Sequence, residues 1–82
     1  MKISIDISYY PLNEGYVVPI LDFIARLNQY HQLVVETNGM STQVFGEYDD
    51  VMKAVTAEIK KSFELPHSVF ILKMVNAHLQ KS

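Results

Sequence analysis

Apolar and polar residues alternate along the first part of this chain, from Lys2 to Tyr10. The set on one side is Ile3, Ile5, Ile7 and Tyr9, and the set on the other is Lys2, Ser4, Asp6, Ser8 and Tyr10. A period of two is typical of a strand with one buried face. The pattern therefore predicts a strand that is closed by Pro11 and that presents its polar side to an open face of a sheet.

Two later stretches carry apolar residues at helical spacing. The first predicts a helix from about Val18 to Tyr30, with Pro19 in the first turn, where its missing N–H leaves no bond unmade. The second begins behind Asp49, the expected N-cap, and runs to about Glu64. The apolar stripes are Val17, Ile20, Leu21, Ile24 and Leu27 in the first helix, and Val51, Met52, Val55, Ile59 and Phe63 in the second.

Three further strands are expected, over residues 33–37, 42–48 and 68–75. The first two form a hairpin around the turn at residues 38–41, where Asn38-Gly39 would supply the positive φ that tight hairpins need. The remaining residues, 76–82, are a polar tail. Its last part, from His78 to Ser82, would either fray or form a final helical turn.

The resulting order of elements is β-α-β-β-α-β within one domain spanning residues 1–82. Right-handed crossovers place both helices of such a chain on one face of a four-stranded antiparallel sheet. We therefore expect an α+β fold of the ferredoxin-like kind, with the first strand in the centre of the sheet.

The uncovered face of this sheet has an unusual mixture of side chains. If Leu33, Val35 and Val44 pack inward, the same alternation turns their neighbours outward, and the uncharged set Phe70, Leu72 and Met74 is the better core face of the last strand. The outward residues are then Ser4, Asp6, Ser8, Tyr10, Val34, Glu36, Asn38, Gln43, Phe45, Glu47, Val69, Ile71, Lys73 and Val75.

Two interpretations of this face remain open. In one, the apolar positions bury against a second sheet and Asp6 forms a cross-strand pair with Lys73. In the other, part of the face is also a cleft for a flat cationic or amine-bearing ligand, because carboxylates pair with amino groups while an aromatic ring stacks on the ligand. Tyr10 would either stack on such a ligand or fill a dimer seam.

The hairpin turn carries more polar groups than a chain reversal requires. Ser41 and Thr42 would either contact a ligand or cap the turn through bonds to the backbone, and Met40 is either a ligand contact or a packing plug. No other segment of the sequence has the character of a chemical site.

Composition limits the classes of partner. A chain of 82 residues with 49% hydrophobic residues and no cysteine has little to stabilise it alone, so we expect a homodimer or homotetramer through sheet faces or edges. A net charge of −2 excludes partners that require a basic patch, namely nucleic acid and anionic membranes. No apolar run approaches the roughly 20 residues of a membrane helix, so a cytoplasmic protein is expected.

Other functions of the same fold fit poorly. An acylphosphatase-like enzyme needs a cationic cradle, and the only arginine, Arg26, lies within the first predicted helix. His31, His67 and His78 are too dispersed for a metal site or a nucleophile relay. An RNA-binding sheet would need a basic surface, and a heavy-metal carrier would need cysteines. A regulatory module of the amino-acid-sensing type, or a plain assembly module, is the remaining alternative.

Four motifs together resemble the small thiamine-binding proteins of the YkoF-like family. They are Ser8-Tyr9-Tyr10-Pro11-Leu12, Pro19-Ile20, residues 36–42, and Gly46-Glu47-Tyr48. The resemblance spans nearly the whole chain. It implies a ferredoxin-like fold, assembly through the sheets, binding of thiamine or its hydroxymethylpyrimidine half, and neither catalysis nor a cofactor.

The resemblance also implies a site. Carried over by position, the ligand-binding residues are Asn38, Met40, Ser41 and Thr42 of the turn, with Ser8 and Tyr10 of the first strand. On electrostatic grounds we add Asp6, Glu36 and Glu47. The sequence departs from the family at Gly39, where proline is common, and a glycine makes the turn looser.

Overall fold

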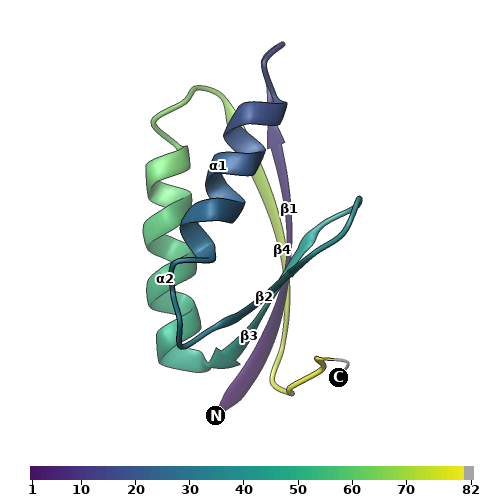
Figure 1. Cartoon of the computed structure of the whole chain (residues 1–82), viewed down its shortest axis with the longest axis vertical. Helices are drawn as coiled ribbons and strands as arrows, with labels where there is room; N and C mark the ends of the chain where they lie inside the picture. Colours follow the sequence, from purple (N-terminus) through teal and green to yellow (C-terminus); the bar gives the residue numbers. More distant parts are fainter. Residues whose placement is uncertain (81–82) are drawn as a thin grey trace.

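The computed structural model describes residues 1–80, in which strands and helices follow the expected order. The elements are β1 (Lys2–Pro11), α1 (Val17–Leu27), β2 (Val34–Thr37), β3 (Thr42–Glu47), α2 (Tyr48–Ser62) and β4 (Ser68–Val75). Both helices lie on one side of the sheet, and the C-terminal segment turns back on the other side (Figure 1). The ferredoxin-like architecture predicted from the sequence is confirmed.

The four strands form one antiparallel sheet in the order β2-β3-β1-β4, so β1 is central, as predicted. Ile5 lies opposite Val44 of β3 and opposite Met74 of β4. Residues that lie opposite each other in an antiparallel ladder share a face of the sheet. The inward face of β1 therefore continues into both of its neighbours.

The hydrophobic core fills the space between this inward face and the two helices. Its buried members are Ile3, Ile5, Ile7, Phe23, Leu27, Leu33, Val44, Val51, Ala54 and Val55. At one end, the rings of Tyr9 and Phe70 stack with centroids 4.2 Å apart, and Phe23 meets Tyr9 edge-on at 5.6 Å. Aromatic pairs at such distances stabilise a core beyond the area that they bury.

The face assignments for β3 and β4 are also confirmed. Val44 is fully buried, and the register places Leu72 opposite Ile7, on the helix side of β4. Because β4 is an edge strand, the helices cover it incompletely, and Leu72 and Met74 remain 38% and 48% exposed. One edge of the sheet is thus both apolar and accessible.

The first helix ends at Leu27, earlier than the predicted Tyr30. Beyond it, the amides of Gln29 and Tyr30 donate to the carbonyls of Arg26 and Leu27 at 3.2 and 3.1 Å. These bonds reach back only three residues, so the helix closes in a tighter turn that satisfies its last carbonyls.

The prediction that Asp49 caps the second helix is wrong. Helix α2 already begins at Tyr48, and the N-cap residue is Glu47, whose side chain makes no capping bond. The amide of Tyr48 instead donates to the carbonyl of Met1, at 2.8 Å. Asp49 lies in the first turn, where its negative charge is favourable beside the positive end of the helix dipole.

A polar cluster joins the two helices. Arg26 Nε donates to Glu58 Oε1 at 2.7 Å, and its Nη2 donates to Ser62 Oγ at 2.6 Å. The Tyr30 hydroxyl donates to the second oxygen of Glu58 at 2.6 Å, and this bond raises the pKa of the phenol. The guanidinium of Arg26 is therefore engaged in the contact between helices, which leaves it poorly placed to bind an anion.

Gly46 of β3 lies against the start of α2. A Cβ atom at this position would come within 3.0 Å of Leu33 Cδ2 and 3.2 Å of Val51 Cγ2. The strand and the helix can approach this closely only because residue 46 has no side chain.

We predict that Gly46→Ala lowers the free energy of unfolding by about 1–3 kcal/mol, the usual effect of adding a methyl group to a packed interior. Urea unfolding of the purified protein measures the change. Gly15→Ala is the control, because a Cβ there meets nothing within 4 Å. Equal stability changes for the two variants would contradict the proposed close contact.

Candidate functional site

A groove of about 500 Å³ lies on the open face of the sheet, away from the helices. Strands β1, β3 and β4 form its floor, and the ends of β2 and the C-terminal segment flank it. Its lining residues are Ser4, Ile5, Asp6, Glu36, Asn38, Gln43, Phe45, Lys73, Met74, Val75 and Leu79. We refer to this set as the groove.

Asp6 is the best-connected polar residue of the groove. Its Oδ1 accepts hydrogen bonds from Ser41 Oγ at 2.6 Å and from Gln43 Nε2 at 2.8 Å. Gln43 Nε2 also lies 2.8 Å from Ser41 Oγ, which closes the network. On the other side, Oδ2 lies 4.0 Å from Lys73 Nζ, so the cross-strand pair that belongs to the first interpretation of this face is present.

These contacts keep Asp6 ionised. The hydrogen bonds from Ser41 and Gln43 lower the pKa of the carboxyl group below its ordinary value, burial opposes them, and the charge of Lys73 adds a smaller lowering. Lys73 is 81% exposed, and ion pairs with such exposed partners are weak, so it neutralises the carboxylate only in part. Asp6 therefore supplies negative charge to the groove.

A second carboxylate reinforces this charge. Glu36 of β2 lies opposite Gln43 and lines the same groove. Its Oε2 accepts a hydrogen bond of 3.5 Å from Gln80 Nε2. With two carboxylates and one exposed ammonium group, the groove favours a cationic or amine-bearing molecule.

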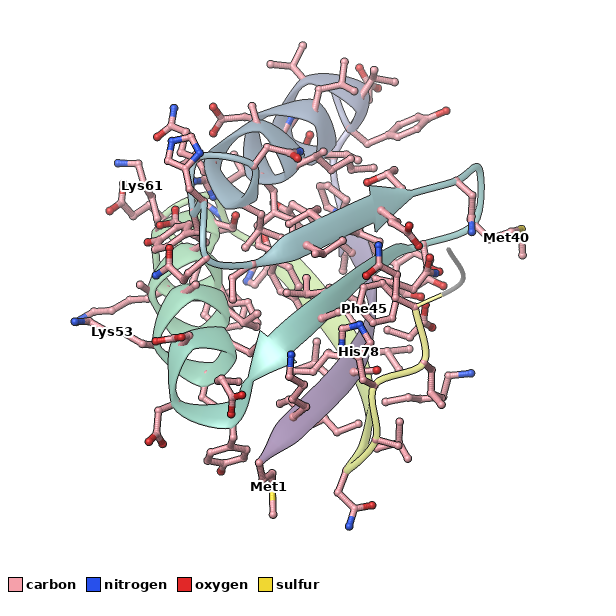
Figure 2. The ribbon with its side chains drawn as sticks, turned by 60° about the horizontal axis from the view of Figure 1, so that its bottom comes forward. Met1, Met40, Phe45, Lys53, Lys61 and His78 are labelled. Atoms are coloured by element: carbon pink, nitrogen blue, oxygen red, sulfur yellow. The ribbon has the colours of Figure 1, made fainter. Side chains whose placement is uncertain are left out.

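The segment after β4 covers part of the open face. Phe45 points to this face yet is only 5% exposed, because the His78 ring lies 5.7 Å from its ring centre. Figure 2 shows the two side chains next to each other. Residues 78–80 are therefore neither frayed nor helical, contrary to the prediction for the tail, and Lys81 and Ser82 lie outside the described residues.

The side chain of Asn38 stabilises the hairpin turn between β2 and β3. Within residues 1–80 no glycine has a positive φ, so the conformation predicted for Gly39 is wrong. Asn38 Oδ1 instead accepts hydrogen bonds from the amides of Met40 at 2.7 Å and Ser41 at 3.1 Å, and the Asn38 amide donates to the Ser41 carbonyl. The Asn38 side chain replaces the left-handed glycine.

The predicted ligand-binding residues of the turn divide between two surfaces. Asn38 lines the groove, and Ser41 reaches Asp6 from the turn. Met40 and Thr42, with Asn38 and Ser41, line a separate cavity of about 130 Å³ between the turn and α1. Thr42 is buried there and pairs with Thr37, whereas Met40 is 87% exposed and extends outward, which argues against a packing plug (Figure 2).

Among the other predicted site residues, Asp6 and Glu36 line the groove, but Ser8, Tyr10 and Glu47 do not. Ser8 and Tyr10 lie farther along β1, opposite Ile71 and Val69. Glu47 lies at the far end of β3, where its carboxylate pairs with the N-terminal amine at 3.2 Å. The structure thus does not bring these three residues together with Asp6.

Sequence reasoning missed eight of the eleven groove residues, among them Gln43 and Leu79. Gln43 was placed on the open face but not at the site, although strand alternation sets it beside Asp6. Leu79 lies in the polar tail, for which fraying or a final helical turn is predicted, and the leucine is the only signal that this segment packs against the sheet.

Among residues 1–80, no cluster of histidine, acidic or cysteine side chains is arranged to hold a metal ion. In the same part of the chain, no helix has the length and apolar character needed to cross a membrane.

Several solved structures resemble this chain. A hypothetical protein from Methanocaldococcus jannascii matches with a TM-score of 0.80 and 25% identity, over 98% of this chain and 84% of that one. A domain of unknown function, DUF77, from Bacillus cereus matches with a TM-score of 0.72 and 15% identity, over 100% and 82%. A Thermotoga maritima protein assigned provisionally to thiamine biosynthesis or salvage matches with a TM-score of 0.69 and 18% identity, over 94% and 85%.

These likenesses establish a shared fold. No protein-family model matches the sequence, and no match is found among curated proteins.

The lowered pKa of Asp6 predicts how stability depends on pH. Because the folded-state pKa lies below the unfolded value of about 3.9, the Asp6 network stabilises the protein fully above that pH and loses its effect as the pH falls through the folded-state value. The free energy of unfolding of the parent protein should therefore exceed that of Asp6→Asn by a constant amount from pH 8 to 5, and the difference should shrink at lower pH. Urea unfolding across this range measures it, with Glu14→Gln as a control at an exposed acid. An advantage that grows on acidification would contradict the assignment.

Proposed function

We propose that the groove binds a small heteroaromatic molecule with an amino or cationic group, of the thiamine or hydroxymethylpyrimidine kind. The observation that carries this proposal is the carboxylate of Asp6, held ionised by Ser41 and Gln43 in a groove whose other walls are largely apolar. Such a carboxylate accepts charge-assisted hydrogen bonds, the stronger class of these bonds.

The dimensions and lining of the groove suit such a ligand. Its volume of about 500 Å³ falls within the range of pockets for small molecules, about 300 to 1,000 Å³. Phe45 and Val75 are apolar side chains of the floor, and Asp6 and Glu36 can accept hydrogen bonds from the amino group of a ligand. Binding pockets usually combine apolar surface with polar groups that fix the orientation of the ligand.

The fold of the Thermotoga maritima protein assigned provisionally to thiamine biosynthesis or salvage supports this proposal, as does the resemblance of the sequence motifs to the YkoF-like family. The first line of support rests on backbone shape, and the second rests on sequence motifs spread over nearly the whole chain. Membership of this chain in that family is part of the proposal.

We further propose that binding serves carriage or sequestration in the cytoplasm, without catalysis or a cofactor. A general base works best when its pKa lies near the operating pH. The hydrogen bonds to Asp6 move its pKa in the opposite direction, which suits a fixed electrostatic anchor.

The protein is also proposed to assemble with itself. Strand β4 has one unpaired edge, and Val69, Ile71 and Val75 expose 40%, 55% and 38% of their surface on its open face. An accessible apolar edge is a template for pairing with another chain. The same observation favours the second candidate function, a structural or regulatory assembly module without thiamine binding.

Calorimetric titration of the purified protein with thiamine, and separately with hydroxymethylpyrimidine, tests ligand binding. We expect saturable binding of one equivalent per chain or fewer, and a rise in melting temperature, since a ligand that binds only the folded state stabilises it. The absence of both heat and a thermal shift at millimolar ligand would favour the assembly module.

Asp6→Asn should weaken thiamine binding by about tenfold, the effect of losing one charge-assisted contact, while the fold is kept. Asparagine retains an oxygen that can accept the hydrogen bonds from Ser41 and Gln43. Glu14→Gln, in the loop before α1, removes a charge outside the groove and should leave the affinity unchanged. Equal affinities of Asp6→Asn and the parent protein would remove Asp6 from the site.

Assembly is tested by Ile71→Lys, which places a charge on the edge strand. Sedimentation equilibrium should show an oligomer for the parent chain and a shift toward monomer for the variant, because an unpaired charge is costly in an apolar interface. Ala57→Lys, on the exposed face of α2, is the control for the added charge. A parent chain that is monomeric at high concentration would contradict self-assembly.

A further inference from the structure

The C-terminal strap, residues 76–80, is fastened to the sheet by one side chain. Ser4 Oγ donates to the carbonyl of Ala77 at 2.7 Å and accepts from the amide of Leu79 at 2.9 Å. A serine hydroxyl carries one donor and two acceptor positions, so both bonds form together. Although it points to the open face, Ser4 is only 7% exposed, since the strap lies over it.

The strap also packs the imidazole ring of His78 against the ring of Phe45. The His78 and Phe45 ring centres are 5.7 Å apart and their planes are tilted by 54°, within the range of attractive aromatic pairs. No helix covers this face, and yet Phe45 is 5% exposed. The strap therefore covers most of the aromatic surface of Phe45, a residue that lines the groove.

The strap also places a nitrogen donor on Glu36. Gln80 Nε2 donates to Glu36 Oε2 at 3.5 Å, at the long end of hydrogen-bond distances. A bond of this length is readily exchanged for a shorter one from a charged or amino donor. Leu79, which lies between His78 and Gln80, lines the groove itself.

We propose that the strap is a built-in competitor for the groove, in which His78 and Gln80 take the places of a ligand's ring and amino group. The structure thereby assigns Phe45 as the stacking surface and Glu36 as the acceptor for a flat, amine-bearing heteroaromatic molecule. Ser4 is the positioning residue that holds the competitor in place. This inference rests on the proposed function of the groove.

Competition has a thermodynamic consequence. When only the fraction of molecules with an open strap binds tightly, the apparent affinity is reduced by that fraction. By linkage, a ligand that requires the open strap must also open it. Loosening the strap should therefore tighten binding, and adding ligand should loosen the strap.

The test uses the full chain and two readouts, hydrogen exchange at the Leu79 amide and the thiamine Kd. Ser4→Ala removes the partner of that amide, so its exchange should accelerate by about tenfold. The thiamine Kd should fall by a factor of about three to ten, and thiamine added to the parent protein should accelerate Leu79 exchange. Thr56→Ala, on an exposed face of α2, is the control for loss of a hydroxyl.

A second variant guards against misfolding of a changed central strand. The double variant His78→Ala and Gln80→Ala changes only residues outside the strands. Like Ser4→Ala, it should lower the thiamine Kd. Faster exchange with an unchanged or weaker affinity would overturn the competition while leaving the proposed function intact. Unchanged exchange in Ser4→Ala would overturn the role of Ser4. Failure of thiamine to bind the parent and both variants would overturn the proposed function, and the inference with it.

Discussion

The burial of alternate β1 residues beneath the two helices is the constraint on which the rest of the structure depends. Once Ile3, Ile5 and Ile7 are enclosed, the period of two leaves Ser4 and Asp6 on the opposite face. A slip of one residue would bring Asp6 into the core, where an unpaired charge is very costly. Hydrophobic burial on one face of β1 therefore fixes where the Asp6 carboxylate and the Ser4 hydroxyl lie on the other face.

The helices divide the sheet unequally, and this division creates the surface available for function. Arg26 and Glu58, 14% and 13% exposed, hold α1 and α2 against each other. The two helices cover β1 and β3 well, but they leave the inward side chains of β4 partly exposed. The open face is then filled in part by the strap, so that the protein encloses Phe45 with its own chain and leaves a groove beside it.

Local pattern accounts for much of this structure. The alternation in β1 correctly predicted its faces and, to within one residue, its limits, because Pro11 still pairs with Ser68. The uncharged set of β4 correctly predicted which side packs inward. The turn could not be predicted in the same way, because Asn38 satisfies backbone amides with its side chain, and such bonds compete with the glycine conformation that the dipeptide favours. The strap was missed because the partners of Ser4 lie 73 and 75 residues away along the chain, and no periodicity encodes contacts of that kind.

Lys73 is the single charged residue between Ser68 and Val75. Its pairing with Asp6 is weak, but its position in the middle of an apolar edge strand has a separate effect. Short apolar segments without charge are the ones that stack into cross-β aggregates, and a lysine within such a segment opposes that stacking through repulsion between neighbouring copies. The ammonium group that partly offsets the negative charge of the groove therefore also opposes fibre formation at the accessible edge of β4.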